Sequence, residues 1–431
     1  MVKVTHFSPV SSFGGLNIIH RELENLGVGN HLNDSLPVMP AQSKYDWKDL
    51  FYSLLSIYYS GGDCIEDLST VLGNRFGYSP LFKLCSPDTL LKRMKELSVE
   101  DFICRTSRGS VEHQYNYNER ILDANIKMLK HIKAFNGNEN VLDYDNTIIF
   151  TEKADSKMTY KRDYGYQPGV CFLNEKQVLF IENRNGNSDA KSFQVDTLRR
   201  MFDRLQHHGI NRIDRFRADA ASHQYEVIQL LSQKVKYFYV GARNSYVEKY
   251  FSKITNWKAT VDSQNEPIWV GDITITPFEK HYLSGQNVPS YRLLVKKKLR
   301  PDAQGNLFTG DACDYKSVIT NDLDSSIENG LAFYYRRGVA ERQFDVLKND
   351  MGWNNLPFSV LAQNTVFLYL TAMVKNLYDK ILEVISSRYK LIKPNLRMKR
   401  LVFLLISIPG KWIKKSRQWY LRLYGSLPLR E

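Results

Sequence analysis

The chain has 431 residues, of which 43% are hydrophobic and 13% aromatic, so it is too apolar for a disordered protein and long enough for two or three folding units. Its five cysteines are an odd number without a C-x-x-C pair, which argues against a disulfide framework and a cysteine zinc site. The start lacks a basic region followed by an apolar stretch, and the apolar run 401–410 is too short to cross a bilayer. We therefore expect no membrane segment and a cytoplasmic protein.

The formal net charge of +13 is concentrated at the end of the chain. Residues 388–431 contain twelve Lys or Arg and one acid, whereas residues 1–138 contain fifteen of each sign. Aromatic rings alternate with these cations in the stretch 411–424, which suits phosphates and bases better than bulk water. A solvated basic tail is the alternative. The side chains predicted to bind DNA here are Lys411, Lys414, Lys415 and Arg417.

Two kinds of periodicity divide the rest of the chain. Apolar residues recur at helical spacing within 1–138, which predicts a helical N-terminal region. We expect this region to serve in DNA binding or dimerisation. Short runs of branched and aromatic residues dominate 139–386, which predicts a catalytic domain of mixed α/β type, and 387–431 is the basic C-terminal segment.

One N-terminal segment resembles a DNA-reading helix. Ser86-Pro87-Asp88 supplies an N-cap, a proline for the first turn and an acid at the positive helix end, so a helix is expected at 89–97. This helix would carry Lys92 and Arg93 as DNA contacts. Together with a preceding helix at 65–76 it matches either a helix-turn-helix or an ordinary helical hairpin with a solvated basic face.

The central segment alternates strands and helices. Three consecutive strands are followed by a helix at 190–205, a fourth strand, another helix and a fifth strand, which is the order of a ribonuclease-H-like mixed sheet. A β-rich insertion with strands at 267–275 and 291–296 is expected at about 243–314, before a short strand and a long helix at 327–350. The five expected strands of the sheet are 141–150, 169–173, 177–182, 212–218 and 235–240.

Three carboxylates stand where strand ends and a helix face bring them together. Asp145 lies on the first strand, Asp219 follows the fourth strand at its carboxyl end, and Glu341 lies in the long helix. Asp143 competes with Asp145, because alternation along a strand sends both side chains to the same face. Carboxylate oxygens are the ligands that Mg²⁺ prefers, so the three acids Asp145, Asp219 and Glu341 form a candidate metal site.

The helix around Glu341 makes this acidic triad specific. Tyr334, Arg337, Glu341 and Lys348 follow the pattern Y-(2)-R-(3)-E-(6)-K. Steps of three, four and seven place all four side chains on one helix face. That face offers one carboxylate flanked by two cations and a phenol, which suits a DNA backbone entering a metal site.

This pattern resembles the YREK signature of bacterial insertion-sequence transposases of the DDE class. Asp145-Asn146-Thr147 is similar to the D-x-T of the first catalytic aspartate in that class, and Arg217-Ala218-Asp219 to the R-x-D of the second. The gap between Asp219 and Glu341 suits those members with a β-strand insertion before the catalytic glutamate.

The resemblance implies the chemistry and the partners. Asp145, Asp219 and Glu341 would hold two divalent ions, Mg²⁺ with Mn²⁺ able to substitute, and Tyr334, Arg337 and Lys348 would contact phosphates. The enzyme would cut double-stranded DNA at terminal inverted repeats and join the freed 3′-hydroxyl ends to target DNA, as a homodimer in a bacterial nucleoid. Trp257 and Trp269 would either stack on a displaced base or lie buried in the insertion.

Two other functions fit the same residues. A metal-dependent nuclease would use the carboxylates without strand transfer, and a DNA-binding protein derived from a transposase would no longer cut. The intact acids and helix pattern argue against the second.

Overall fold

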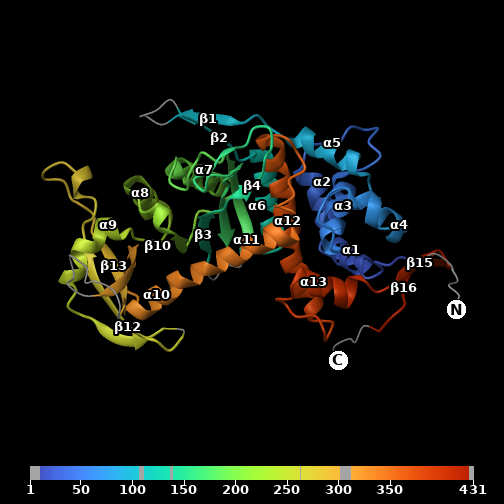
Figure 1. Ribbon diagram of the computed structural model, residues 1–431. Coiled ribbons are helices and arrows are strands. Elements are labelled where there is room, and N and C mark those ends of the chain that lie inside the picture. The colour runs from blue at the N-terminus through green and yellow to red at the C-terminus, as the bar shows by residue number, and fades with distance from the viewer. Residues whose placement is uncertain (1–9, 106–110, 136–138, 263, 301–311, 427–431) are drawn as a thin grey trace.

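The protein is a mixed α/β molecule in which one large sheet is flanked by a group of N-terminal helices (Figure 1). The computed structural model describes residues 10–105, 111–135, 139–262, 264–300 and 312–426. The sheet has eleven strands in the order β1-β2-β8-β7-β3-β9-β10-β14-β13-β12-β11, and a hydrophobic core runs from its central strands into the N-terminal helices.

The five central strands follow one another along the chain in the predicted order, three strands and then two more that are each preceded by a helix. β3, β7 and β8 are antiparallel neighbours, and β9 and β10 run parallel to β3 on its other side. Their side chains are almost all buried, as expected for branched and aromatic residues in the middle of a large sheet. The bounds are β3 Val141–Asn146, β7 Gly169–Leu173, β8 Gln177–Arg184, β9 Arg215–Ala218 and β10 Tyr237–Gly241.

Two elements of this region differ from the prediction. The strand expected over 141–150 ends at Asn146, because the chain then turns into a separate three-stranded sheet of β4 (Ile149–Phe150), β6 (Tyr164–Tyr166) and β5 (Lys157–Met158). The helix expected at 190–205 is α7, Gln194–His207.

The later start of α7 has a local cause. The Asp189 carboxylate accepts backbone N–H bonds from Lys191 and Ser192, which holds this segment in a turn. Phe193 then adopts a positive φ of 54°, so the helix begins only after it. The second crossover helix, α8, spans Tyr225–Lys234 and connects β9 to β10.

The β-rich insertion extends the central sheet. β14 pairs antiparallel with β10, and β13, β12 and β11 follow in turn, so the insertion's strands continue the same ladder outward. Two short helical segments lead into it, α9 (Asn244–Val247) and a 3₁₀ helix over Glu248–Lys253. The four strands are β11 Lys258–Val261, β12 Pro267–Ile275, β13 Tyr291–Leu299 and β14 Cys313–Thr320.

The N-terminal region is helical but also contributes two strands. β1 (Phe102–Arg105) and β2 (Glu112–Asn116) form a hairpin that pairs with β8 at the edge of the sheet, which helical periodicity did not predict. The predicted boundary at residue 138 lies outside the described residues. The helices are α1 Leu16–Asn25, α2 Val28–Ser35, α3 Trp47–Tyr59, α5 Pro87–Leu97 and α6 Glu119–His131.

Of the two alternatives for residues 65–97, the structure does not match the helix-turn-helix. α5 is capped as expected, because the Ser86 hydroxyl accepts the Thr89 N–H and Pro87 occupies the first turn. The segment before it is a π-helical turn, Leu68–Leu72, followed by the short α4, Gly73–Arg75. The connection from Arg75 to Pro87 is much longer than the roughly 3–4 residues of that motif. Leu90 and Met94 of α5 are buried in the core.

A long buried helix, α12 (Leu361–Ser386), stands between the central strands and the N-terminal helices (Figure 1). On the sheet side, the Tyr369 hydroxyl accepts the Ile181 N–H at 3.0 Å and donates to the Ile181 carbonyl at 2.6 Å. On the other side, the Tyr59 hydroxyl of α3 donates to the Val374 carbonyl at 3.0 Å. The helix therefore joins both halves of the core through hydrogen bonds as well as apolar contacts.

The basic C-terminal segment ends in a β-hairpin. A short α13 (Met398–Leu401) and a π-helical turn (Val402–Ile406) lead into β15 (Gly410–Lys415) and β16 (Gln418–Leu423). Within the part of the chain that the structure describes, every helix is too short or too polar to cross a membrane.

Candidate active site

The carboxyl ends of the three parallel strands meet at one edge of the sheet. Asp145 lies near the end of β3, Asp219 follows β9 directly, and Gly241 ends β10. A Cβ atom at Gly241 would lie 2.5 Å from the Tyr334 hydroxyl and 3.0 Å from the Ala220 nitrogen. Only glycine therefore allows this close approach between the helix that bears Tyr334 and the strand ends.

The long helix predicted over 327–350 is broken. α10 (Ile327–Tyr335) ends in a 3₁₀ turn over Arg336–Gly338, and α11 (Val339–Asp350) continues from there. Tyr334 and Glu341 thus lie on different helices, with Arg337 in the turn between them.

The two cationic side chains of the four-residue pattern donate hydrogen bonds to residues at or just after the end of β3. Arg337 Nη1 donates to Asp145 Oδ2 at 2.7 Å. Lys348 Nζ donates to the Ile148 carbonyl at 2.7 Å. Arg337 and Lys348 therefore both contact the chain around Asp145, although the single helix that was predicted to align them is broken.

The predicted acids open into two neighbouring cavities. Asp145, Asp219 and Lys348 line one of about 500 Å³. Glu341, Tyr334 and Arg337 line another of about 580 Å³. Among the described residues, the three carboxylates do not converge within the distance that one metal ion requires. Arg337 lies at the boundary, because it lines the Glu341 cavity while its guanidinium pairs with Asp145.

Burial makes the Asp145 cavity unfavourable for charge. It raises the pKa of Asp145 to about 6, an effect that Arg337 opposes and the nearby Asp219 reinforces. Burial also lowers the pKa of Lys348, and the charge of Lys161 adds to this. A carboxylate that is costly to ionise near a second one is a position where a bound cation would be stabilising.

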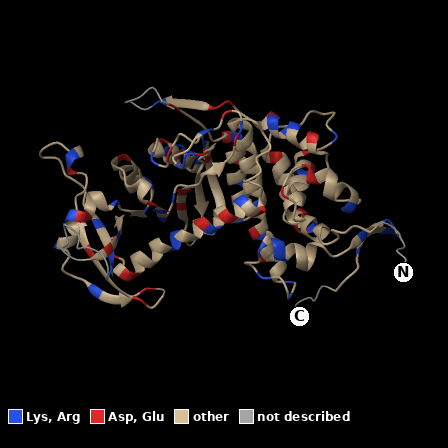
Figure 2. Ribbon diagram, in the orientation of Figure 1, with Lys and Arg blue, Asp and Glu red and all other residues tan. Residues whose placement is uncertain are grey.

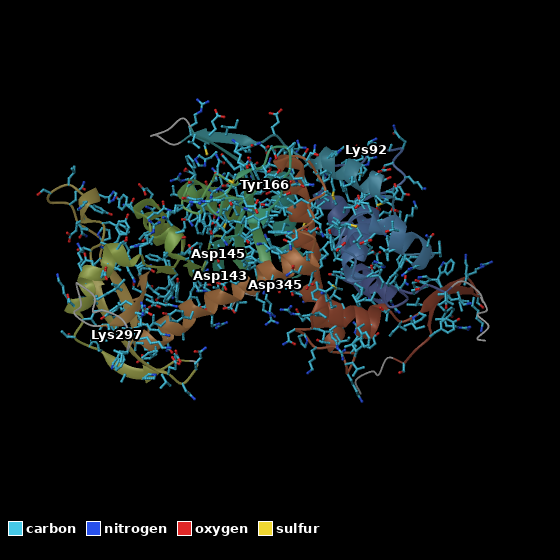
Figure 3. The ribbon with its side chains drawn as sticks, viewed as in Figure 1. Lys92, Asp143, Asp145, Tyr166, Lys297 and Asp345 are labelled. Carbon is cyan, nitrogen blue, oxygen red and sulfur yellow. The ribbon has the colours of Figure 1, made fainter. Side chains whose placement is uncertain are left out.

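Asp143 has a different role from Asp145, although both lie on β3 (Figure 3). Its carboxylate accepts two bonds from Arg217, at 2.5 Å from Nε and 2.8 Å from Nη2. Arg217 also donates to Glu175 at 2.8 Å and to the Phe333 carbonyl of α10 at 2.7 Å. Asp143 is only 2% exposed, so its oxygens are committed to this buried ion pair, which favours Asp145 as the metal ligand.

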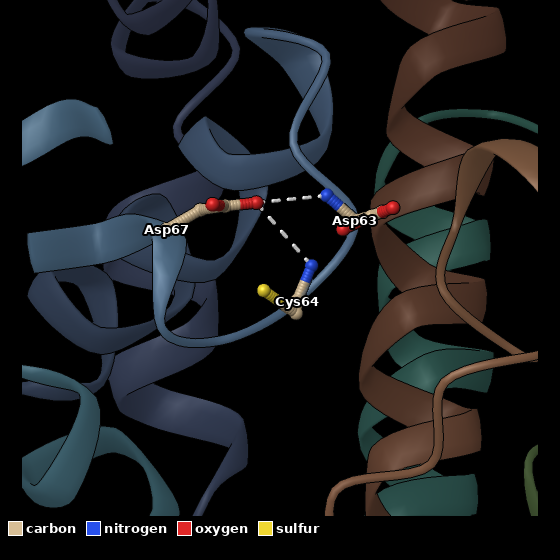
Figure 4. A group of neighbouring side chains, drawn as sticks. All are labelled: Asp63, Cys64 and Asp67. Carbon is tan, nitrogen blue, oxygen red and sulfur yellow. Dashed lines mark hydrogen bonds between the residues drawn. The ribbon is translucent and has the colours of Figure 1, made fainter. Parts of the chain in front are cut away.

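A second acidic group lies far from these cavities. Asp63, Cys64 and Asp67 are the one trio of potential ligands that meet within ion-binding distance among the described residues (Figure 4). The Asp67 carboxylate accepts the backbone N–H groups of Asp63 at 3.0 Å and Cys64 at 3.4 Å. It therefore holds a loop together, which is a structural role.

The predicted DNA contacts outside the pattern lie on other surfaces. Lys92 is exposed on α5 and lies well away from Asp145 (Figure 3), while Arg93 pairs with Glu96 at 2.6 Å. Trp257 and Trp269 are half-buried in the insertion, and the Lys297 ammonium lies 4.4 Å from the Trp257 ring centre. The remaining four stand on the C-terminal hairpin: Lys411, Lys414, Lys415 and Arg417.

Sequence reasoning missed one wall of the Asp145 cavity. The small sheet and its turn contribute Phe150, Tyr160 and Lys161, and the loop before α7 contributes Lys191. Tyr160 is 67% exposed and Phe150 48%. Their spacing in the sequence does not identify them as cavity residues. Those of the small sheet line the cavity because the chain turns away after β3 and folds back beside Asp145. The sequence also indicated no role for Arg217. It belongs to the R-x-D pattern, but that pattern does not predict its ion pair with Asp143.

Comparison with known proteins identifies the family. A family model described as "Transposase DDE domain group 1" matches residues 5–431, nearly the whole chain. Among solved structures, a cryo-EM structure of a piggyBac transposase synaptic complex with hairpin DNA is similar, with a TM-score of 0.41 and 10% identity over 91% of this chain and 80% of that one. No curated protein sequence matches.

The extent of the family match decides the assignment. It confirms the predicted DDE class and with it a DNA-cleaving and strand-joining enzyme of a kind that uses divalent metal, whereas the YREK pattern stays a prediction. The piggyBac similarity is too weak to add to the argument. The chain belongs to the DDE transposase family, and it is an enzyme of DNA transposition.

Proposed function

We propose that this transposase cuts DNA at the terminal inverted repeats of an insertion sequence and joins the freed 3′-hydroxyl ends to target DNA, using a ribonuclease-H-like catalytic domain. The observation that carries the proposal is the meeting of Asp145 and Asp219 at the carboxyl ends of β3 and β9, with Arg337 bonded to Asp145. A nuclease without strand transfer is the second candidate, since the same carboxylates would serve it.

The donor set fits a hard divalent cation. Asp145 and Asp219 offer carboxylate oxygens to one cavity, and Glu341 offers a third carboxylate next to it. These three residues would hold two Mg²⁺ ions, with Mn²⁺ as a substitute. Two ions held there would supply an activated water and stabilise the leaving oxygen of the phosphodiester.

The surrounding cations would hold the DNA strand. Lys348, Lys161 and Lys191 line the cavity that contains Asp145, so their ammonium groups are placed for the phosphates beside the scissile bond. Arg337, now paired with Asp145, would transfer its guanidinium to a phosphate oxygen when that carboxylate takes up metal. Tyr334, beside it, would donate its hydroxyl to the same strand.

More distant cations would hold the rest of the element's end. Lys92 and Arg93 of α5 and the hairpin residues Lys411, Lys414, Lys415 and Arg417 lie outside both cavities, so their contacts would be with DNA beyond the cut. Because two ends must be cut together, we expect a homodimer in the end-bound complex.

The test uses purified protein, Mg²⁺ or Mn²⁺ and DNA carrying the terminal repeats. The wild type should produce ends with free 3′-hydroxyls and joined products, and Glu341→Gln should abolish both while still binding the repeats. The matched control is Asp345→Asn, which removes an exposed carboxylate from the same helix, outside both cavities (Figure 3).

Three outcomes separate the candidates. Cut ends without joined products would favour the nuclease. Full cutting by Glu341→Gln, or equal loss in Asp345→Asn, would overturn the role of Glu341. Tight binding without any cutting by the wild type would favour a protein that only binds DNA.

A further inference from the structure

The C-terminal hairpin of β15 and β16 is a compact source of positive charge. It carries five cations and no acid, and Figure 2 marks Lys and Arg positions in blue on the ribbon at this end of the molecule. Among the described residues, no carboxylate pairs with any of the five, which are Lys411, Lys414, Lys415, Arg417 and Arg422.

The two faces of the hairpin have different surroundings. One face packs on the N-terminal helices: the Trp412 indole N–H donates to Asn17 Oδ1 at 2.9 Å, and the Trp419 ring lies 5.3 Å from that of Tyr78. Strand alternation turns the opposite face away from these contacts. That outward face carries Lys411, Ile413, Lys415, Gln418, Tyr420 and Arg422, of which Lys411 and Ile413 are half-buried and the other four exposed.

The base of the hairpin is anchored. Ser11 and Gly410 exchange two backbone hydrogen bonds, at 2.8 and 2.9 Å, so a segment from the other end of the chain joins the β15 edge. A Cβ at Gly410 would lie 3.0 Å from the Gly14 Cα, which shows how closely the backbones approach. These contacts therefore fix the position of the outward face relative to the rest of the molecule.

Two features of the hairpin cost stability. Lys411 and Arg422 are directly opposite each other on adjacent strands, and like charges in that position repel. The two-residue turn places Ser416 at φ 51° and Arg417 at φ 63°, positions that normally hold Asn and Gly. A long cationic side chain at the tip is therefore kept where glycine would be less strained.

We propose that this hairpin is a β-ribbon that enters the major groove of the element's terminal duplex, with Arg417 at its tip contacting base edges. A two-stranded ribbon fits that groove, and the Arg guanidinium matches the paired acceptors of guanine. Lys411, Lys415 and Arg422 on the outward face hold the flanking phosphates. The inference rests on the proposed function, because it takes the terminal repeats as the DNA that is read.

The strained turn permits a test that separates binding from folding. Arg417→Gly removes the cation and relieves the positive φ, so the thermal midpoint should stay equal or rise. Its affinity for a terminal-repeat duplex should fall about tenfold or more, with a much smaller loss on a scrambled duplex of equal composition. Binding is measured by fluorescence anisotropy with the full chain in EDTA, where cutting does not interfere.

Two further variants serve as references. Lys133→Gly makes the same change at an exposed lysine with φ 60° at the end of α6, and it should leave binding to both duplexes unchanged. Lys415→Ala should weaken binding to both duplexes alike and reduce the slope of affinity against salt by about one.

The outcomes distinguish failure of the groove contact from failure of the proposed cutting. A full repeat preference in Arg417→Gly, or equal losses on the two duplexes, would overturn the groove contact while leaving cutting by the wild type intact. If the wild type binds the repeats through Arg417 but cuts nothing when Mg²⁺ is added, the ribbon stands and the proposed cutting fails.

Discussion

Two ion pairs stand two residues apart on β3, and they differ in almost every physical respect. The deep pair, Asp143 with Arg217, has side chains only 3% and 0% exposed, and Arg217 donates to two further acceptors. The mouth pair, Asp145 with Arg337, has side chains 16% and 18% exposed and borders a cavity. The same residue types therefore have two roles. The deep pair is enclosed by protein, whereas solvent and ligands can reach the mouth pair and replace one of its partners.

The difference shows that one strand can hold a stabilising ion pair and a proposed catalytic residue only two positions apart. A buried pair that loses one partner leaves an uncompensated charge, so the deep pair fixes the position of β9 and of the Phe333 carbonyl on α10. The mouth pair has less to lose, because water and ligands reach it. Breaking each pair in turn tests this contrast.

The largest effect is expected at the mouth pair. Asp145→Asn should reduce cutting about a thousandfold or more, roughly 4 kcal/mol of transition-state stabilisation, because it removes a proposed metal ligand. Stability should change by no more than about 1 kcal/mol. Cleavage assays and urea unfolding on the same preparation measure both, and a variant that cuts normally would contradict the assignment.

The deep pair should show the reverse pattern. Asp143→Asn leaves the buried Arg217 guanidinium with Glu175 as its remaining acidic partner and should cost about 3 kcal/mol of unfolding free energy. Urea unfolding measures it. A variant as stable as the wild type, but inactive, would instead make Asp143 the metal ligand.

Acid sensitivity provides a third test, at a buried group that lies outside both pairs. His20 is fully buried among aromatic rings of the N-terminal helices, and burial lowers its pKa to about 3. The unfolded chain binds the proton more readily, so this contribution is complete above about pH 6.5 and falls as the pH drops towards 3.

The loss from His20 should reach about 1.4 kcal/mol per pH unit in that window. His20→Gln, which keeps a polar group for the Ser56 hydroxyl, should flatten the stability curve between pH 6.5 and 4. His207→Gln, at an exposed position, is the control. An unchanged curve in His20→Gln would contradict the assignment of the acid sensitivity to His20.

The smallest effect is expected at the cavity wall beside the mouth pair. Tyr160→Ala removes an exposed ring from the cavity that contains Asp145 and should weaken cutting of the ends about tenfold, the value of one stacked base. Tyr164→Ala removes another exposed ring of the same small sheet, one that does not line the cavity, and this variant should cut normally. Equal losses in both would mean that the sheet itself had been disturbed.

The sequence predicted those features that depend on neighbours along the chain. The strands β7 and β12 have the predicted bounds, because turn residues mark their ends. The Ser86 cap likewise follows from local spacing.

The features that were missed depend on contacts distant in sequence. Pairing of β2 with β8 brings a short polar strand into the sheet without an alternating pattern of its own. The break between α10 and α11 occurs where Arg217 holds the Phe333 carbonyl, a contact that spans more than a hundred residues. The choice between Asp143 and Asp145 needed the same information, since both face the same way on the strand.

The position of α12 has a consequence for how the molecule is made. The N-terminal helices complete their core only against residues 361–386, because the Tyr59 hydroxyl and the apolar face of α5 find their partners there. During synthesis the apolar surfaces of these helices stay uncovered until residues 361–386 have left the ribosome. A nascent chain truncated before α12 would therefore be a target for chaperones and proteases.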